Sequence, residues 1–498
     1  MILNFKKMKN YHKIFTIAMC FTIGLISACK KDFLNKEPIS QGTAGNYYKN
    51  ASDAEGGLVG AYQQAFLTDQ YWAWDYTTNG DARADNCYAG GDNPDNFAID
   101  NFSPTSLNGN VTRDWQGLYQ DIYAANIVLD YVPKIPADQF ANGRQAQIFG
   151  EVKFIRALSY FQLVTTFGDV PLVLSTINFT AKPTRTPAAA VYAQIVKDLT
   201  DAEASLPVSF ANVGHATKGA AQALLAKVYA QEGKYQECLN YCNKVISSGQ
   251  YTLVPNFATL FNGTKNTSES ILEIQHSDAS GFTTYNVSLY LPAQFGTYSF
   301  KKFNLPTNDL INLYRSQGDS IRLNSSIYLA SVAPDGTAAG DPIPAPYTAS
   351  SPKIPFLYKW KTNISQFGGG TDNTILLRLA DIILLKAEAL NKLGQTAQAI
   401  PLVNQIRARV KLPAITVTSQ SDVGLAILTE RRMELAFEGF RWNDLLRYGD
   451  QYTISLMNSQ VDPAGKPLNY GVTQNKLIFP VPYNEIQLDG NLSQNPGY

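Results

Sequence analysis

Aromatic side chains with polar neighbours gather in one stretch of the chain, between residues 69 and 100. Four aromatics fall within six positions, and acids, an arginine and an amide follow closely: Tyr71, Trp72, Trp74, Tyr76, Asp81, Arg83, Asp85 and Asn86. Flat aromatic faces can stack on a ligand, and the polar groups can hydrogen-bond it. If the stretch is extended, Trp72 and Trp74 share one face. The stretch predicts a ligand-binding platform, with packing of the same rings onto neighbouring helices as the alternative.

A second, weaker candidate lies between Tyr285 and Phe303, where Tyr290 and Tyr298 are the expected contacts and Trp360 could join them. Both stretches are predicted to be loops. Binding residues concentrate on loops that a rigid scaffold positions. We therefore expect the ligand to be held by side chains from one or both stretches.

The residue patterns of most catalytic and metal centres are missing from the sequence. It contains no G-x-S-x-G motif, Walker loop, H-E-x-x-H motif or Cys–His pair. The cysteines lack zinc spacing, and the acids between Asp81 and Asp95 do not follow the EF-hand pattern. We predict no catalytic residue, no cofactor and no metal ion. Paired carboxylates leave a glycosidase open as the competing enzyme class.

Charged residues run through an apolar stretch from Ile427 to Gly449. Large apolar residues recur there at near-helical spacing, and the charges between them are Glu430, Arg431, Arg432, Glu434, Glu438 and Arg441. Buried charges persist only when they are paired and hydrogen-bonded. Arg431 and Glu434 are three positions apart, as are Glu438 and Arg441, so each pair could meet on one helix face. We predict a buried helix whose ion pairs brace the core.

The elements that would position these residues are helices. Segments 226–243 and 387–404 share one pattern at a constant offset: a helix, a glycine-marked turn and a second helix with small residues facing inward. Such pairs are typical of tetratricopeptide repeats, and their separation indicates an interrupted array. The predicted fold is mainly α, a superhelix of tetratricopeptide-like helical pairs with a loop-rich insert. We expect irregular structure over 333–355, and loops and short strands after about Tyr452.

The N-terminus has the pattern of an exported lipoprotein. Four lysines and no acid precede an apolar run from Ile14 to Ile26, and Cys29 follows two small residues. Cys29 is the expected lipidation site; a plain signal peptide with an incidental cysteine is the alternative.

Without the leader the chain has 37 basic and 41 acidic residues, which gives no electrostatic case for nucleic acid. The expected regions are a leader at 1–28, a tether at 29–50, an N-terminal helical region at 51–280 with a loop insert at about 68–113, a loop-rich ligand-side region at 281–370 and a C-terminal helical region at 371–498.

Five sequence blocks, in order, resemble the SusD/RagB family of outer-membrane lipoproteins. Residues 430–449 resemble its E-R-R-x-E-L-x-F-E-G-x-R-W-x-D-L-x-R-x-G signature. The other similar blocks are R-A-x-x-Y-F-x-L with F-G-D-V-P at 156–171, K-A-E-A-L-N-x-L-G at 386–394, N-x-I-R-x-R at 404–409, and P-x-P-x-x-E-I with the closing Q-N-P-G-Y at 480–498. The resemblance covers nearly the whole chain.

The resemblance implies a binding protein rather than an enzyme. Family members bind nutrients at the cell surface, usually oligosaccharides and sometimes peptides, and sit on a TonB-dependent transporter of the SusC type. For this chain it implies an outer-membrane protein, anchored through lipid on Cys29, with an oligosaccharide ligand. A peptide ligand, or a tetratricopeptide scaffold that binds only proteins, are the alternatives. Exposed loop aromatics favour the sugar ligand.

Overall fold

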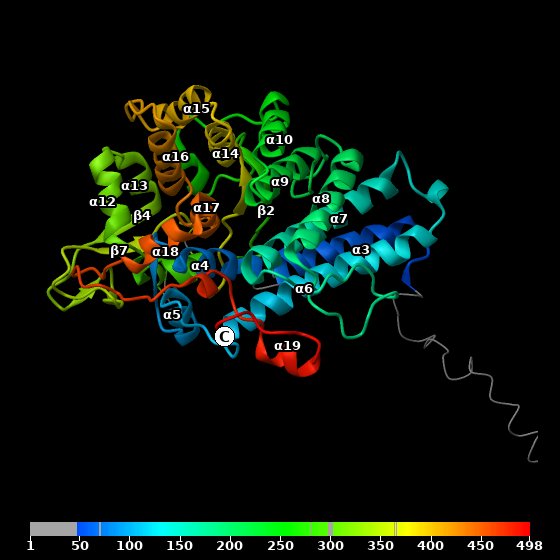
Figure 1. Cartoon of the computed structure of the whole chain (residues 1–498), viewed down its shortest axis with the longest axis horizontal. Coiled ribbons are helices and arrows are strands. Elements are labelled where there is room, and N and C mark those ends of the chain that lie inside the picture. Colours follow the sequence, from blue (N-terminus) through cyan, green and yellow to red (C-terminus); the bar gives the residue numbers. More distant parts are fainter. Residues whose placement is uncertain (1–46, 69–70, 280, 297–301, 363, 365) are drawn as a thin grey trace, which may run out of the picture.

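The computed structural model describes residues 47–68, 71–279, 281–296, 302–362, 364 and 366–498. Its long helices lie side by side along an arc (Figure 1), and each packs on its neighbour in chain order. They are α3 (Ala51–Gln63), α6 (Gly109–Tyr131), α7 (Arg144–Phe167), α8 (Ala188–Ser205), α9 (Lys218–Gln231), α10 (Tyr235–Ser247), α14 (Leu379–Lys392), α15 (Thr396–Arg409) and α16 (Gln420–Glu434). None of the described helices has the length and apolar character needed to cross a membrane.

Both helix pairs expected from the repeated pattern are present. The α9–α10 turn contains Gly233 and the α14–α15 turn contains Gly394, with φ angles of 73° and 75° that glycine adopts without strain. Small buried residues such as Ala226 and Cys238 let the helices approach closely. Because α10 packs directly on α14, the intervening residues leave the helical stack and return to it. The predicted mainly α, interrupted superhelix is confirmed.

The segment between α10 and α14 contains short elements. Its helices are α11 (Asn286–Tyr290), α12 (Asn308–Gln317) and α13 (Ser320–Ser326). In the described part of the chain, strands pair two at a time and antiparallel: β1 (Cys87–Gly90) with β3 (Phe303–Pro306), β2 (Ser270–Ile274) with β8 (Thr374–Arg378), β4 (Ile327–Ala330) with β7 (Ile354–Leu357), and β5 (Thr337–Ala338) with β6 (Asp341–Pro342). The β1–β3 pair joins the aromatic stretch near residue 71 to this insert, so two distant parts of the sequence meet there.

The expected loop over 68–113 is largely helical, which corrects the sequence prediction. It contains two π-helical turns, η2 (Gln64–Thr68) and η3 (Tyr71–Asp75), followed by α4 (Tyr76–Ala82), β1 and α5 (Pro94–Asp100). Its aromatic rings pack into the helical core, and burying them favours a backbone whose own hydrogen bonds are satisfied. This segment, residues 68–113, therefore lies between the long helices and the segment that joins α10 to α14. The first is called the wedge below, and the second the insert.

The expected continuous helix from 427 to 449 is two helices. The first, α16, ends at Glu434, and α17 (Arg441–Tyr448) begins after a tight turn. Phe437 and Gly439 have positive φ angles of 65° and 77° in that turn. A Cβ atom at Gly439 would lie 2.9 Å from the Tyr76 carbonyl oxygen, so only glycine allows this contact between the wedge and the turn.

The chain end is also more helical than expected. Helix α18 (Asp450–Asn458) extends past Tyr452, and α19 (Tyr483–Leu488) forms in the closing segment. Over the described residues after Tyr452, β-structure is limited to one isolated bridge between Val461 and Pro467.

Candidate functional site

A cleft of about 340 Å³ opens beside Trp74, where the wedge meets the insert. Its walls come from η3, α4, the turn before α5, the start of α6, α11, β3 and the loop before β8. The lining residues are Trp74, Asp75, Thr78, Asp92, Asn93, Pro94, Asn96, Arg113, Leu289, Phe303 and Phe367. Aromatic rings and polar groups are therefore presented together, in a space large enough for a small organic ligand.

Three aromatic rings form a continuous ridge at this cleft. The half-buried Trp74 ring meets Tyr285 edge to face, with ring centroids 4.9 Å apart. Tyr285 in turn contacts Phe367 at 5.2 Å. Phe367 keeps 43% of its surface exposed. Because Tyr285 contacts both other rings, it helps to hold Trp74 and Phe367 in place while part of each ring stays accessible.

Arg113 is fixed at the edge of the same cleft by two hydrogen bonds to one carboxylate. Its Nε and Nη2 donate to the two oxygens of Asp75 at 2.6 and 2.7 Å, and Nη2 also donates to Asn110 at 2.9 Å. The guanidinium carbon lies 5.6 Å from the Trp74 ring centroid. Such bidentate pairing fixes the plane of the guanidinium, so its orientation toward a ligand is set beforehand.

A second carboxyl group lies beneath this ion pair. Burial, together with the neighbouring Asp75 carboxylate, raises the pKa of Asp114 well above its usual value. Asn79 donates a hydrogen bond to Asp114 at 2.8 Å. Burial also raises the pKa of Asp75, and the Arg113 guanidinium beside it acts in the opposite direction.

Of the four aromatics predicted for the binding platform, only Trp74 lines this cleft. Tyr71, Trp72 and Tyr76 are buried, and Trp72 is only 2% exposed. Tyr71 donates to Gln162 at 3.0 Å, and the Trp72 Nε1 donates to Asp121 at 3.3 Å. The predicted surface position of these three residues is wrong because the segment is helical. The two tryptophans therefore point in different directions instead of sharing one face.

The polar residues predicted to contact the ligand hold the wedge to the C-terminal helices instead. Asp85 accepts two hydrogen bonds from Arg441 at 2.7 and 2.8 Å, and Asn86 accepts one from Arg432 at 3.0 Å. The backbone N–H of Gly439 donates to Asp81 at 3.0 Å. All three acceptors are buried, and none of them lines the cleft. The prediction that Asp81, Asp85 and Asn86 are exposed at the ligand site is therefore wrong.

Arg83 is buried, and no carboxylate among the described residues pairs with it. Its guanidinium lies between the rings of Trp442 and Phe479, 4.5 and 4.0 Å from their centroids, and donates to the Leu477 carbonyl at 2.5 Å. Burial lowers the pKa of Arg83 to about 10. Arg83 therefore fastens the closing segment of the chain instead of reaching the cleft.

Tyr290, from the second predicted binding stretch (Tyr285 to Phe303), is also buried. Tyr290 is fully buried, and its hydroxyl lies 2.7 and 2.9 Å from those of Thr77 and Thr78. It packs against Trp360 at a centroid distance of 5.5 Å. Tyr298 lies outside the described residues. Arg113 and Phe367 were not predicted from the sequence. Arg113 lies near the start of the long helix α6 and Phe367 lies in a glycine-rich loop, and neither belongs to an aromatic cluster in the sequence.

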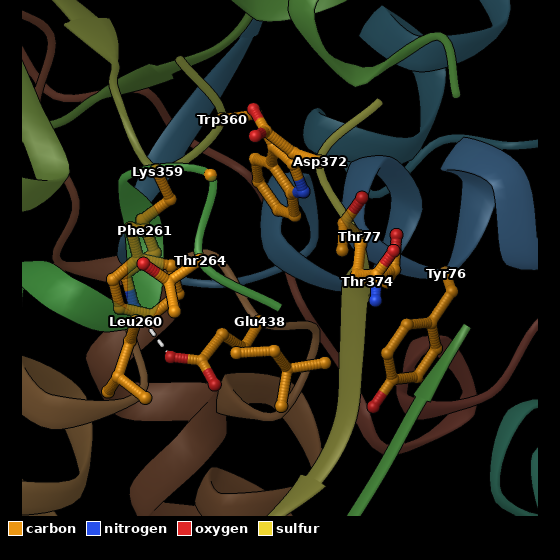
Figure 2. A pocket seen from close by; sticks show the side chains of 13 residues that line it. Tyr76, Thr77, Leu260, Phe261, Thr264, Lys359, Trp360, Asp372, Thr374 and Glu438 are labelled. Carbon is orange, nitrogen blue, oxygen red and sulfur yellow. Dashed lines mark hydrogen bonds and ion pairs between the residues drawn. The ribbon is translucent and has the colours of Figure 1, made fainter. Parts of the chain in front are cut away.

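A smaller cavity on the other side of the wedge is a packing defect rather than a site. Figure 2 shows Lys359 beside Phe261 and Glu438 below them, with Trp360 and Asp372 on the upper side of the cavity. The cavity measures about 20 Å³, which suits roughly one water molecule. Lys359 donates to Glu438 at 2.5 Å and lies 4.3 Å from the Phe261 ring centroid. Lys359 and Glu438 thus neutralise each other within the protein.

The charges of the 427–449 stretch form a buried network, but with partners other than those expected. Arg431 pairs with Asp381 and Asp444 at 2.8 and 2.9 Å, not with Glu434. Glu434 accepts from Arg378 at 2.6 Å and from Arg322 at 3.1 Å, and it also pairs with Arg409. Arg431 and Glu434 share α16, but each pairs with residues of other elements, and Glu438 lies in the turn before α17, so its three-residue spacing to Arg441 is not a helical one. Over the described residues, no cluster of three potential ligands could hold a metal ion.

Two family models match this chain. Residues 32–230 match the model described as starch-binding and associating with the outer membrane, and residues 335–498 match the model of the SusD family. The chain belongs to the SusD family.

Relatives along the whole length agree with this membership. A SusD-like protein of Formosa agariphila is 29% identical, and the match spans 99% of this chain and all of the relative. The starch-binding protein SusD of Bacteroides thetaiotaomicron is 24% identical over 70% of this chain and 72% of its own. These SusD-like relatives place the chain in a carbohydrate-binding family.

Solved structures share the fold. A SusD superfamily protein of Bacteroides vulgatus superposes with a TM-score of 0.77 at 23% identity, covering 91% of this chain and all of that one. A laminarin-binding SusD-like protein gives a TM-score of 0.74 at 28% identity, with the same coverage. The tetratricopeptide-like superhelix is thus the SusD fold.

Proposed function

We propose that this SusD-family protein binds an oligosaccharide in the Trp74 cleft and delivers it to a TonB-dependent transporter of the SusC type in the outer membrane. The observation that carries the proposal is the aromatic ridge of Trp74, Tyr285 and Phe367 beside the fixed Arg113. Sugar rings present apolar C–H faces that stack on such rings, while their hydroxyls bond to polar groups. Asp92 and Asn93 line the same cleft and supply further oxygen and nitrogen atoms.

The first ligands to test follow from the relatives. One solved relative is named as laminarin-binding and another relative as starch-binding, so β-glucan and α-glucan oligosaccharides are the natural probes. Calorimetric titration of the purified protein, after a screen on a glycan array, should find saturable binding of one class. If the protein binds peptides and no glycan, its ligand class is peptides and the proposed delivery role is unchanged. Binding of neither would refute it.

We propose that the cleft binds without hydrolysis. Asp75, one of its acids, is buried and held by both nitrogens of the Arg113 fork, so it is poorly placed to donate a proton or attack a sugar. Incubation of the protein with its glycan should leave the oligosaccharide length unchanged by chromatography. Shorter products that disappear on replacing Asp75 or Asp92 would show a glycosidase instead.

We propose that lipid on Cys29 anchors the protein in the outer membrane at the cell surface. Cys29 lies outside the described residues, and the proposal rests on the small residues and the apolar run that precede it. Cys29→Ala should move the protein from the membrane to the soluble fraction. Retention of the variant in the membrane would show that something other than this lipid holds it.

A further inference from the structure

A second cavity, of about 270 Å³, opens between α3, η2, the loop before α9 and the end of β2. Its lining residues on α3 and η2 recur at helical spacing from Glu55 to Leu67, so one continuous face forms a wall. Val59 and Val213 are 61% and 64% exposed at its rim, and Phe282 is 44% exposed. Large apolar side chains gathered in this way mark a surface that another molecule covers. Among the described residues, this α3 pocket shares none with the Trp74 cleft.

An imidazole of fixed orientation lies in the wall of the α3 pocket. His215 lines the pocket, and its Nδ1 lies 2.6 Å from an oxygen of Glu151. The ring stacks on Phe210, with centroids 4.6 Å apart and planes 27° from parallel, and it meets Tyr62 edge to face at 5.8 Å. The hydrogen bond and the two ring contacts set the plane of the imidazole before any ligand binds, which lowers the cost of binding.

The surroundings of Glu151 determine which ring nitrogen of His215 carries the hydrogen. Glu151 is fully buried and accepts from the Tyr62 hydroxyl at 2.7 Å and from Arg144 at 2.8 Å. The Tyr62 hydroxyl accepts from the Ala216 N–H, so its own hydrogen points to Glu151. Because Glu151 is an acceptor, Nδ1 of His215 donates to it, and Nε2 of the neutral ring is an acceptor. No described residue bonds Nε2, so this nitrogen is available to a donor in the pocket.

The acids of the α3 pocket already have partners in the protein. Glu55 accepts from Nε and Nη2 of Arg144 at 2.7 and 2.9 Å. Glu273 accepts from the Asn266 N–H at 2.9 Å, and the Asn266 side chain donates to Gln275 at 2.8 Å. A sugar carries a hydroxyl on most of its carbons and would lose hydration here without regaining hydrogen bonds. The pocket therefore suits an apolar ligand with a single donor.

The size and walls of the pocket favour two fused aromatic rings. An apolar cavity of about 150 Å³ holds one benzene ring. At about 270 Å³, the α3 pocket has room for a second ring. Leu58, Phe66 and Ile274 are buried apolar side chains of its wall, and Phe282 adds an aromatic ring at the rim. Phenylalanine rings gain from edge-to-face contact with an aromatic guest, in addition to the burial of apolar area.

We propose that the α3 pocket binds a small aromatic alcohol of about two fused rings. Its rings pack against Leu58, Phe66 and Ile274, and its hydroxyl donates to Nε2 of His215. The site and the class of ligand both differ from those of the proposed glycan-binding function, so this inference does not depend on it.

The test compares two probes that differ in one hydrogen. Calorimetric titration of the purified protein uses β-naphthol and its methyl ether, which has no hydrogen to donate. We expect β-naphthol to bind at one site, about fivefold more tightly than the ether, which is the effect of one neutral hydrogen bond. His215→Phe keeps a ring on Phe210 and removes the acceptor, so the two probes should bind to this variant equally.

A pair of double variants tests the location of the site. Val59→Glu with Val213→Glu places two carboxylates at the rim of the pocket, and both probes should bind about tenfold more weakly or worse, because the charges would be desolvated. Val417→Glu with Val461→Glu changes two exposed valines that do not line the pocket, and affinity should stay the same. Melting temperatures of all variants show whether they are folded.

Several results would overturn the proposal. One is the lack of saturable β-naphthol binding to the wild type, and another is equal wild-type affinity for β-naphthol and its ether. Tighter binding of decanol than of β-naphthol would assign the pocket to an acyl chain instead. If the rim variant keeps its melting temperature but loses glycan affinity, the pocket is part of the glycan site and not a separate one.

Discussion

The cleft beside Trp74 and the charge network around Glu434 use similar residues for different ends. In the network, each carboxylate meets cations from several elements, and Glu434, Arg378 and Arg322 are fully buried. In the cleft, one arginine meets one acid at the edge, and the aromatic rings stay partly exposed. A charge whose hydrogen bonds are all used by the protein has none to offer a ligand, whereas a supported, open ring has a free face. Stability and binding are thus separable in this fold.

The largest expected effect comes from breaking the network. Glu434→Ala leaves Arg378, Arg322 and Arg409 without their shared partner in a buried site. The free energy of unfolding should fall by about 3–5 kcal/mol, because an uncompensated buried charge is costly. Urea denaturation followed by circular dichroism measures this loss.

A surface ion pair provides the control for that variant. Asp201 pairs with Lys153 and Lys197, and all three are partly exposed. Asp201→Ala should therefore cost at most about 1 kcal/mol. Equal losses for Glu434→Ala and Asp201→Ala would mean that the network contributes no more than an ordinary surface pair.

Replacing Trp74 should weaken ligand binding and leave stability largely unchanged, in contrast to Glu434→Ala. Trp74→Ala removes a stacking face from the cleft, so glycan affinity should weaken by about 1–3 kcal/mol, by analogy with stacking of bases on aromatic side chains. Trp72→Ala should instead destabilise the fold by about 3–5 kcal/mol, since its ring is buried in the helical core. Calorimetry and thermal melts on both variants measure the two quantities.

The exposed Tyr452, which does not line the cleft, gives the matched aromatic control. Tyr452→Ala should change neither binding nor melting temperature appreciably. If Trp74→Ala keeps full affinity while remaining folded, the glycan does not stack at this cleft.

A smaller effect is expected at the edge of the cleft. Arg113→Lys keeps the positive charge but loses the two-pronged bond to Asp75, so the cation is no longer held at a fixed angle. Affinity for the glycan should fall by about 1 kcal/mol, with Trp74 still able to stack. Unchanged affinity by calorimetry would show that Arg113 serves only to neutralise Asp75.

The sequence allowed the scaffold to be predicted much better than the site. Repeated small residues and glycines at helix turns, as at Gly233 and Gly394, are local signals, and the helix pairs followed from them. The orientation of Trp72 and Trp74 depends on whether residues 71–75 are extended or helical. That choice is made by burial of Tyr71 and Trp72 against α6 and α7, and nothing within the stretch reveals it. Phe367 reaches the cleft through long-range packing on Tyr285.

Asp81 allows the smallest and most specific test, because the sequence placed it at the ligand and the structure places it at the Gly439 turn. Burial raises its pKa to about 7, against the hydrogen bond from Gly439 and the attraction of Lys359, which lower it. A carboxyl whose pKa is higher in the folded than in the unfolded state adds stability that is complete below about pH 4. That stability is lost as the pH rises through about 7. Between pH 6 and 8, wild-type protein should therefore lose about 1 kcal/mol more stability than Asp81→Asn, which keeps the shape and cannot titrate. Urea unfolding at both pH values measures the difference, and glycan affinity should be equal in the two proteins. If the unfolding free energies of wild type and Asp81→Asn change equally with pH, the raised pKa of Asp81 is contradicted. Lost affinity at unchanged stability would return Asp81 to the ligand site.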